Sequence, residues 1–345
     1  MNFSAPQFSS WLARLNTQPT RHRLWICVGV YLLLIAWAWY WPYTGDGDSL
    51  LHYWNLRTTW LDPKLGLTSW ARPVYVLLMI LPAQFGWFAV RCFAALVTTV
   101  LVWQTMRMAD DLQLPNGAMA GLLLVFQPLA FALASDTMTE IPMALGLAIA
   151  LRLWWAKRFT ASCLLVSFLP LVRPEGFLIA PVWGLFLLLL PRKREYPSWP
   201  QRFLIGASLA TGVVTLLLVC RLVTGKWLYF LYEWSWPLIG TQKGSFWHHF
   251  IHWPYYCGWM LLPLFLIGLL PSCKRAMGLP WAAWAVVFLA HSYMFWTGTF
   301  GALGFMRILV STAPVTALIC LYGWNAIARL VRAHQWPESV QQGVA

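Results

Sequence analysis

Carboxylates are scarce in this chain: only 11 of its 345 residues are Asp or Glu, and charged residues of both signs make up 10%. A soluble globular domain has a charged share of about a quarter. The sequence is instead 60% hydrophobic and contains 25 tryptophans. These proportions exclude an ordinary soluble domain and predict an all-α polytopic membrane protein.

The sequence also lacks the common ligand-binding motifs. Its seven cysteines are scattered singly, without Cys-x-x-Cys spacing, which excludes the usual zinc motifs and a disulfide framework. It has no internal repeat, nucleotide-binding glycine loop or low-complexity tract. The net charge of +13 would suit nucleic acid, but the basic residues form short clusters between apolar runs. We therefore predict no nucleic-acid partner and interpret the charge as a signal of membrane orientation.

Apolar runs long enough to cross a bilayer recur along the chain. The run 73–85 is short and contains Pro82, so we interpret it as an interfacial or re-entrant piece. Residues 1–333 form a single predicted transmembrane catalytic domain, and 334–345 a cytoplasmic tail. Ten spanning helices are predicted, near 24–41, 87–106, 117–134, 138–155, 160–171, 177–190, 203–222, 257–271, 279–297 and 306–328.

The distribution of basic residues tests this topology. With ten spans and an inner N-terminus, most of the 24 basic residues fall on the inner face, as the positive-inside rule requires. An eleventh span at 73–85 would move the Arg-Lys-Arg run at 192–194 to the outer face. The first run has no small-residue cleavage site after it, so it predicts an uncleaved anchor. The inner acidic residues are Asp110, Asp111, Glu195 and Glu338.

The stretch 41–60, WPYTGDGDSLLHYWNLRTTW, follows the first predicted span and holds Asp46 and Asp48 in a flexible Gly-Asp-Gly-Asp turn. A helix over 48–60 would place Asp48, His52, Asn55 and Thr59 on one face. This pattern predicts a helix that lies on the membrane with its polar side towards a cavity. The structural alternative is a solvated turn in which Asp48 caps the helix.

Four further segments place ionisable residues on the predicted outer face. Ser135 to Glu140 contains Asp136 and Glu140 and also fits a capping box, so it could simply begin a helix. Arg173 and Glu175 lie in an Arg-Pro-Glu-Gly turn; an arginine at the edge of the hydrocarbon usually has a phosphate or carboxylate partner. Arg91 and Arg307 begin spans, where snorkelling to headgroups is the alternative to binding a lipid phosphate.

The predicted outer loop 223–256 is the longest after the first, outer loop 42–86. Glu233 lies in it among aromatic residues, a composition that suits sugar stacking or an interface. His248, His249 and His252 suggest a metal site, but no carboxylate lies near them in the sequence. We therefore interpret this histidine segment as interfacial and amphipathic.

In order along the chain, these motifs resemble those of the type C glycosyltransferase superfamily. The points of similarity are GDGDS followed by LLHYW, interfacial helices after it, Arg91 opening the next span, an SD…E segment, and the RPEG turn. The resemblance implies a membrane enzyme that takes a sugar from a polyprenyl-phosphate carrier on the non-cytoplasmic face. The chain is short for the superfamily and lacks a second DxD and a WWD sequence, which argues against en bloc glycan transfer to asparagine.

The expected activity is transfer of one hexosyl or pentosyl unit to an acceptor hydroxyl, with inversion. Such a reaction needs one carboxylate base and cations for the departing phosphate. Asp48, and after it Asp46, is the predicted base; a divalent cation bridged by Asp46 and Asp48 is an alternative role. The predicted phosphate ligands are Arg91, Arg173 and Arg307. Sugar or acceptor contacts are predicted for Asp136, Glu140, Glu175, His52 and Glu233. The outer loop 42–86 would then be the catalytic loop, and the outer loop 223–256 would cover the acceptor or donor.

The expected partners are a polyprenyl-phosphate sugar, a glycan, lipid or protein acceptor, and the bilayer itself. Two other functions stay open at this stage: a transporter or flippase of a lipid-linked sugar, and a lipid phosphotransferase. The short loops favour a bacterial inner membrane, with the site on its periplasmic face.

Overall fold

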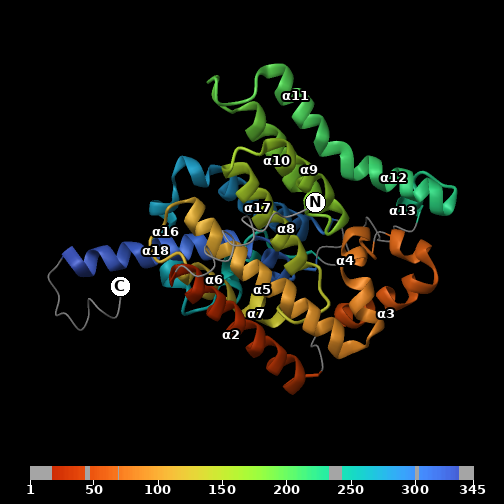
Figure 1. The fold of residues 1–345 in the computed structure, drawn as a ribbon, viewed down its shortest axis with the longest axis horizontal. Helices are drawn as coiled ribbons and strands as arrows, with labels where there is room; N and C mark the ends of the chain where they lie inside the picture. Colours follow the sequence, from red (N-terminus) through yellow and green to blue (C-terminus); the bar gives the residue numbers. More distant parts are fainter. Residues whose placement is uncertain (1–17, 43–46, 69, 233–242, 300–302, 334–345) are drawn as a thin grey trace, which may run out of the picture.

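The computed structural model describes residues 18–42, 47–68, 70–232, 243–299 and 303–333, and these form helices and turns without a strand (Figure 1). The fold is therefore all-α, as predicted. The helices are α2 (Gln18–Tyr40), α3 (Gly47–Leu61), η1 (Pro63–Leu67), α4 (Pro73–Gln84), α5 (Trp87–Asp111), α6 (Met119–Val125), α7 (Pro128–Leu133), α8 (Glu140–Trp155), α9 (Phe159–Phe168), η2 (Leu169–Leu171), α10 (Gly176–Leu188), α11 (Trp199–Ala207), η3 (Ser208–Ala210), α12 (Thr211–Thr224), α13 (Tyr229–Tyr232), α14 (His248–Ile251), α15 (Trp253–Cys257), α16 (Leu262–Ser272), η4 (Arg275–Met277), α17 (Gly278–Thr297), η5 (Met306–Thr312) and α18 (Ala313–Ala333).

The predicted count of ten spans is not confirmed. Among the described residues, five helical stretches are long and apolar enough to cross a membrane: Thr20–Tyr40, Trp87–Asp111, Trp199–Thr224, Arg275–Thr297 and Met306–Val331. The other five predicted spans correspond to shorter helices. The run 73–85 forms the 12-residue helix α4, too short to cross a bilayer as a straight helix.

A proline divides one predicted span into two helices. Pro128 has no N–H to continue the helical ladder, and Gln127 before it is extended, with ψ of 119°. The Gln127 Nε2 group donates to the Ala313 carbonyl, 3.0 Å away, across to η5 and α18. Residues 117–134 are therefore α6 and α7 rather than one helix, because the break at this proline is supported by a neighbouring element.

The central helices pack closely enough to need glycine. A Cβ added at Gly268 of α16 would lie 1.9 Å from the Ile319 carbonyl oxygen of α18, and one at Gly323 would lie 1.9 Å from that of Leu264. The two backbones are therefore in direct contact. Around them, α2 lies alongside α5, and α11 and α12 form a long arm at the edge of the molecule (Figure 1).

Helices α3, η1 and α4, in the predicted first outer loop, pack together into a compact unit. Tyr53 and Leu56 on α3 are buried with Tyr75 and Met79 of α4. The opposite side of α3 carries exposed apolar residues, namely Leu51, Trp54 and Leu61. The helix predicted over 48–60 is observed as α3, with bounds within one residue at either end, and its position on the membrane stays a prediction. His52 and Thr59 of the predicted polar face are buried, whereas Asn55 is half-buried.

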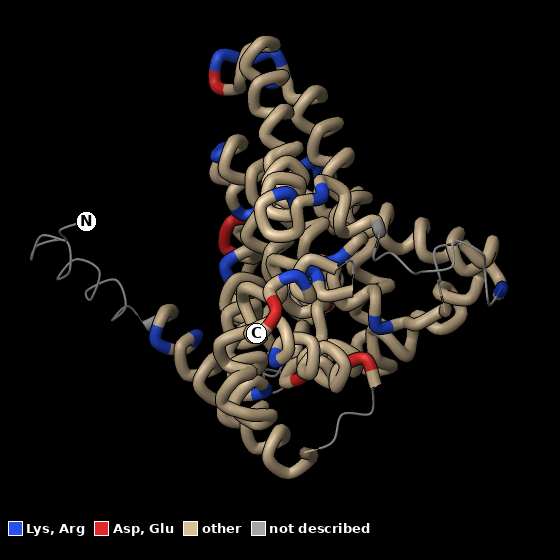
Figure 2. Tube along the Cα trace, turned by 90° about the vertical axis from the view of Figure 1, so that its right-hand side faces the viewer, with Lys and Arg blue, Asp and Glu red and all other residues tan. Residues whose placement is uncertain are grey.

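Asp110 and Asp111, two of the acidic residues predicted to lie on the inner side, pair with arginines. Arg23 Nη2 donates to Asp110 Oδ1 at 2.7 Å, and Arg152 Nε donates to Asp111 Oδ2 at 2.6 Å. Both aspartates end α5, a helix of 25 residues and so about 37 Å long. Arg91 lies in the first turns of the same helix. Charged residues thus gather at the two ends of α5, and Figure 2 shows the long uncharged stretches of the chain.

Candidate active site

A buried network of ion pairs lies where α8 and α10 begin. Arg173 Nη1 is 2.7 Å from Glu140 Oε1, and Arg173 Nη2 is 2.8 Å from Glu175 Oε1. Arg173 Nε also donates to Glu175 Oε2 at 3.1 Å, and His291 Nε2 of α17 lies 3.2 Å from Glu175 Oε1. Buried carboxylates are stable only when paired, so Arg173 is the cation that holds both glutamates.

Arg307, in η5, joins this network to Asp48, in the first turn of α3. Its Nη2 forms an ion pair and hydrogen bond with Asp48 Oδ2, and its Nε lies 3.7 Å from Glu140 Oε1. The two partners are 259 positions apart in the sequence. Five of the predicted site residues, Asp48, Glu140, Arg173, Glu175 and Arg307, therefore form one connected cluster.

Arg72 is a cation of the cluster that the sequence analysis missed. It precedes Pro73 at the start of α4 with φ of 60°, a left-handed conformation that is strained for arginine. Arg72 and Arg173 both donate to Thr139 Oγ1, the latter at 2.9 Å. Burial is the main reason that the pKa of Arg72 is lowered to about 10, and the charge of Arg173 is the second. The signal available in the sequence was the repeated Arg-Pro pair at 72–73 and 173–174.

The start of α3 is fixed by the turn before α8. Ser49 Oγ donates to Asp136 Oδ1, and Thr137 Oγ1 donates to the Ser49 carbonyl at 2.6 Å. The Thr137 N–H also donates to Asp136 Oδ1, at 2.8 Å. No capping box forms at α8, whose N-cap is Thr139 without a side-chain hydrogen bond of that kind. The contacts of Asp136 therefore position the helix that carries Asp48.

His52 packs against the loop that contains Trp70 and Arg72. Its ring stacks on Trp70 with centroids 5.0 Å apart, and the Arg72 guanidinium carbon is 5.7 Å from the Trp70 centroid. Burial, assisted by the charges of Arg72 and Arg173, holds the His52 pKa well below its usual value. His52 is therefore a neutral ring that supports the Arg72 loop.

The guanidinium group of Arg91 donates hydrogen bonds to backbone carbonyls. Its Nε donates to the Ser135 carbonyl at 2.9 Å, and its Nη1 donates to those of Ala38 and Trp41 at 2.9 and 2.6 Å. Ala38 lies in the last turn of α2 and Trp41 follows that helix, where carbonyls have no helical partner. These contacts favour a structural role for Arg91 over the predicted phosphate ligand.

Replacing Arg91 with methionine tests that assignment. We expect a loss of about 2–3 kcal/mol of stability, because three carbonyls lose a buried charged donor, with unchanged affinity for the predicted polyprenyl-phosphate ligand. Thermal unfolding in detergent and lipid titration would measure the two quantities. A variant of normal stability with weakened lipid binding would instead support the role predicted from the sequence.

The two carboxylates at the edges of the cluster differ in basicity. Burial, and after it the charge of Glu140, raises the pKa of Asp48. Burial also opposes ionisation of Glu175, but Arg173 and His291 outweigh it and hold the Glu175 pKa well below its usual value. Asp48 is thus the better proton acceptor of the two.

Two predicted site residues, Asp46 and Glu233, lie outside the described residues. The described part of the chain holds no group of three or more His, Cys, Asp or Glu side chains placed to bind a metal ion. The alternative of a divalent ion bridged by Asp46 and Asp48 depends on Asp46 and stays a prediction. His248 and His252 contact each other, with ring centroids 4.3 Å apart.

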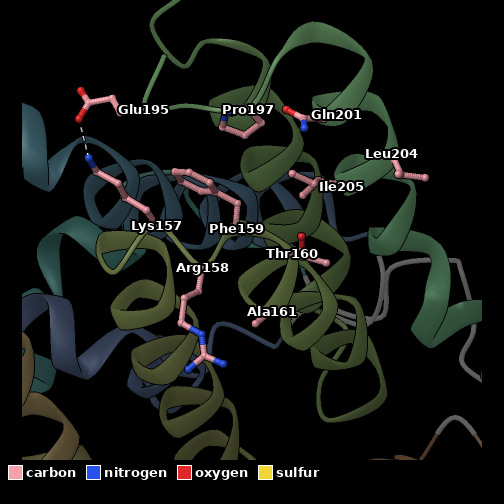
Figure 3. Close-up of a pocket in the computed structure, with 10 residues that line it drawn as sticks. All are labelled: Lys157, Arg158, Phe159, Thr160, Ala161, Glu195, Pro197, Gln201, Leu204 and Ile205. Carbon is pink, nitrogen blue, oxygen red and sulfur yellow. Dashed lines mark hydrogen bonds and ion pairs between the residues drawn. The ribbon is translucent and has the colours of Figure 1, made fainter. Parts of the chain in front are cut away.

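A hollow of about 600 Å³ lies elsewhere, between α9, α11 and the segment before α11, as Figure 3 shows. Its wall includes the exposed ion pair between Lys157 and Glu195, 2.7 Å apart. The 16 residues of α8, about 24 Å of helix, separate Glu140 from the residues that precede Lys157. The hollow is therefore at the other end of α8 from the charged cluster.

The sequence matches no protein-family model and no curated protein. Two solved structures share the fold: ArnT from Cupriavidus metallidurans in the apo state and the same protein bound to undecaprenyl phosphate. The apo structure has a TM-score of 0.59 at 12% identity over 89% of this chain, and the lipid-bound one 0.61 at 14% identity over 90%. The chain spans 60% and 63% of their lengths. At this level of identity, the likeness shows that the chain shares its fold with ArnT.

Proposed function

We propose that the chain is an integral-membrane glycosyltransferase that moves one sugar from a polyprenyl-phosphate carrier to an acceptor hydroxyl. The observation that carries the proposal is the cluster itself: Asp48 is linked by Arg307 to the buried network of Glu140 and Arg173. A proton acceptor beside several cations is the arrangement that glycosyl transfer from a phosphate requires. The fold shared with a protein that binds undecaprenyl phosphate supports the choice of carrier.

The proposed reaction is a single displacement. The acceptor oxygen attacks the anomeric carbon and forms the new glycosidic bond, while Asp48 takes the hydroxyl proton. The bond between the anomeric carbon and the phosphate oxygen breaks, and its electron pair leaves with the carrier phosphate. Attack from the side opposite the phosphate inverts the configuration.

The cations divide into two roles in this proposal. Arg173 is paired with Glu140 and Glu175, so its role is to hold these two side chains in the cluster. Arg72 and Arg307 are placed to receive the phosphate. Among the described residues, the buried Nε of Arg72 has no hydrogen-bond acceptor, which is the free donor that an arriving phosphate oxygen would satisfy.

We place the site on the non-cytoplasmic face of a bacterial inner membrane. The distribution of basic residues supports this orientation. Arg107, Arg152 and Lys157 lie at or just after the ends of α5 and α8 that are away from the cluster, and an excess of Lys and Arg is typical of cytoplasmic loops. We also propose that the loop 223–256, with its Glu233, covers the bound acceptor or donor.

The test is transfer of a labelled sugar from a panel of undecaprenyl-phosphate hexoses and pentoses by the purified chain in nanodiscs. We expect one undecaprenyl phosphate to be released for each labelled acceptor molecule that forms. Movement of the lipid across the bilayer without bond cleavage would favour a flippase, and transfer of the phosphoryl group would favour a phosphotransferase. A chelator added to an active sample separately tests the divalent ion.

A further inference from the structure

The charges of the cluster balance in the absence of any ligand. Three guanidinium groups, on Arg72, Arg173 and Arg307, are coupled to three carboxylates, on Asp48, Glu140 and Glu175. A carrier phosphate that enters this cluster adds negative charge to six described side chains whose formal charges already balance. Some carboxylate must therefore give up its cation when the phosphate binds, since an unbalanced charge in a buried site is costly.

We propose that the donor phosphate replaces Asp48 on Arg307, so that the base is released for catalysis only after the donor has bound. The inference rests on the proposed function and adds an order of events to it. In the empty site Asp48 is held by Arg307; in the donor complex the phosphate takes the guanidinium and Asp48 turns to the acceptor hydroxyl.

The exposure of the three carboxylates decides which of them is displaced. The side chains of Glu140 and Glu175 are 1% and 4% exposed, whereas that of Asp48 is 31% exposed. Displacing either glutamate would leave a buried carboxylate without its cation, which is strongly unfavourable. Asp48 can turn to water instead, and as a first-turn residue of the 15-residue helix α3 it remains favoured by the positive helix end.

The geometry of Arg307 is suited to such an exchange. Its Nε remains within 3.7 Å of Glu140 Oε1 while Nη2 contacts Asp48. Glu140 can therefore keep the guanidinium in place during the replacement of one partner by another. Arginine also presents its donors in a planar fork that matches carboxylate and phosphate oxygens equally well.

A double-mutant cycle on lipid affinity tests the exchange. Undecaprenyl phosphate is titrated into the detergent-solubilised full chain, with quenching of tryptophan fluorescence as the signal. Asp48→Asn removes the competing carboxylate, so its affinity for the lipid is expected to rise about tenfold. In an Arg307→Gln background, the same Asp48→Asn change is expected to give no gain, because the cation for which the two anions compete is gone.

Asp136→Asn is the matched control, because it removes the same charge from a neighbouring aspartate that is bound by Ser49 and the Thr137 N–H rather than by Arg307. A similar gain in this control, or the same gain from Asp48→Asn in both backgrounds, would indicate long-range electrostatics and overturn the exchange. Unchanged or weaker binding by Asp48→Asn would also overturn it and leave the proposed function standing. If neither the wild type nor any variant binds the lipid, both proposals fail.

Discussion

Replacing Asp48 with asparagine is expected to reduce the proposed sugar transfer by about 10²–10⁴-fold, the usual contribution of a general base. Asparagine has nearly the same shape but cannot accept the acceptor's proton. The change lies at a half-exposed position in the first turn of α3, so we expect normal folding. Transfer of labelled sugar, compared with thermal unfolding of the same sample, measures both.

Two comparisons make the Asp48 result specific. Asp136→Asn changes the same residue type in a position that orients α3, so we expect a much smaller loss of transfer. The wild-type rate should rise with pH through the raised pKa of Asp48, since only the ionised carboxylate accepts a proton. Transfer by Asp48→Asn at the wild-type rate would remove Asp48 as the base.

Replacing Arg173 with glutamine is expected to lower the free energy of unfolding by about 3–5 kcal/mol, the cost of breaking a buried ion pair by removing one partner. Glu140 and Glu175 would both remain buried, and each would lose its closest cation. The thermal unfolding midpoint in detergent would report the change, and we expect a low yield of folded protein.

A compensated variant separates charge from packing. Combining Arg173→Gln with Glu140→Gln and Glu175→Gln leaves amides of similar size and no unpaired charge, and such neutral replacements often restore stability. We expect the triple variant to unfold at a higher temperature than Arg173→Gln alone. If the two unfold together, the loss arises from the shape of the guanidinium rather than from its charge.

The parts of the site that could be predicted share a simple physical origin. Asp48, Glu140, Arg173, Glu175 and Arg307 were placed on one face because charged residues in an apolar chain are confined to helix ends. The topology then brings those ends together. Helix α3 was predictable because a Gly-Asp turn precedes a regular alternation of buried and exposed faces.

Other features depend on contacts that leave no pattern in the sequence. The partners of Arg91 are backbone carbonyls, which any residue provides, so its structural role could not be distinguished from phosphate binding. Arg72 lies in a loop whose left-handed backbone is imposed by its surroundings. The predicted count of ten spans is not confirmed, because hydropathy counts apolar residues without registering helix breaks such as those at Pro128 and Gly258.

The length of α8 determines the depth at which the proposed lipid substrate would reach the site. At 16 residues the helix rises about 24 Å, roughly 6 Å less than the hydrocarbon thickness of a bilayer. With its last turn at one membrane surface, its first residue, Glu140, would lie below the headgroups of the opposite leaflet. A long-chain carrier could then arrive by lateral diffusion with its phosphate close to headgroup depth. Only the water-soluble substrate would have to move below the headgroups. The difference between the length of α8 and the thickness of the hydrocarbon layer would therefore determine that this substrate, rather than the carrier phosphate, changes depth.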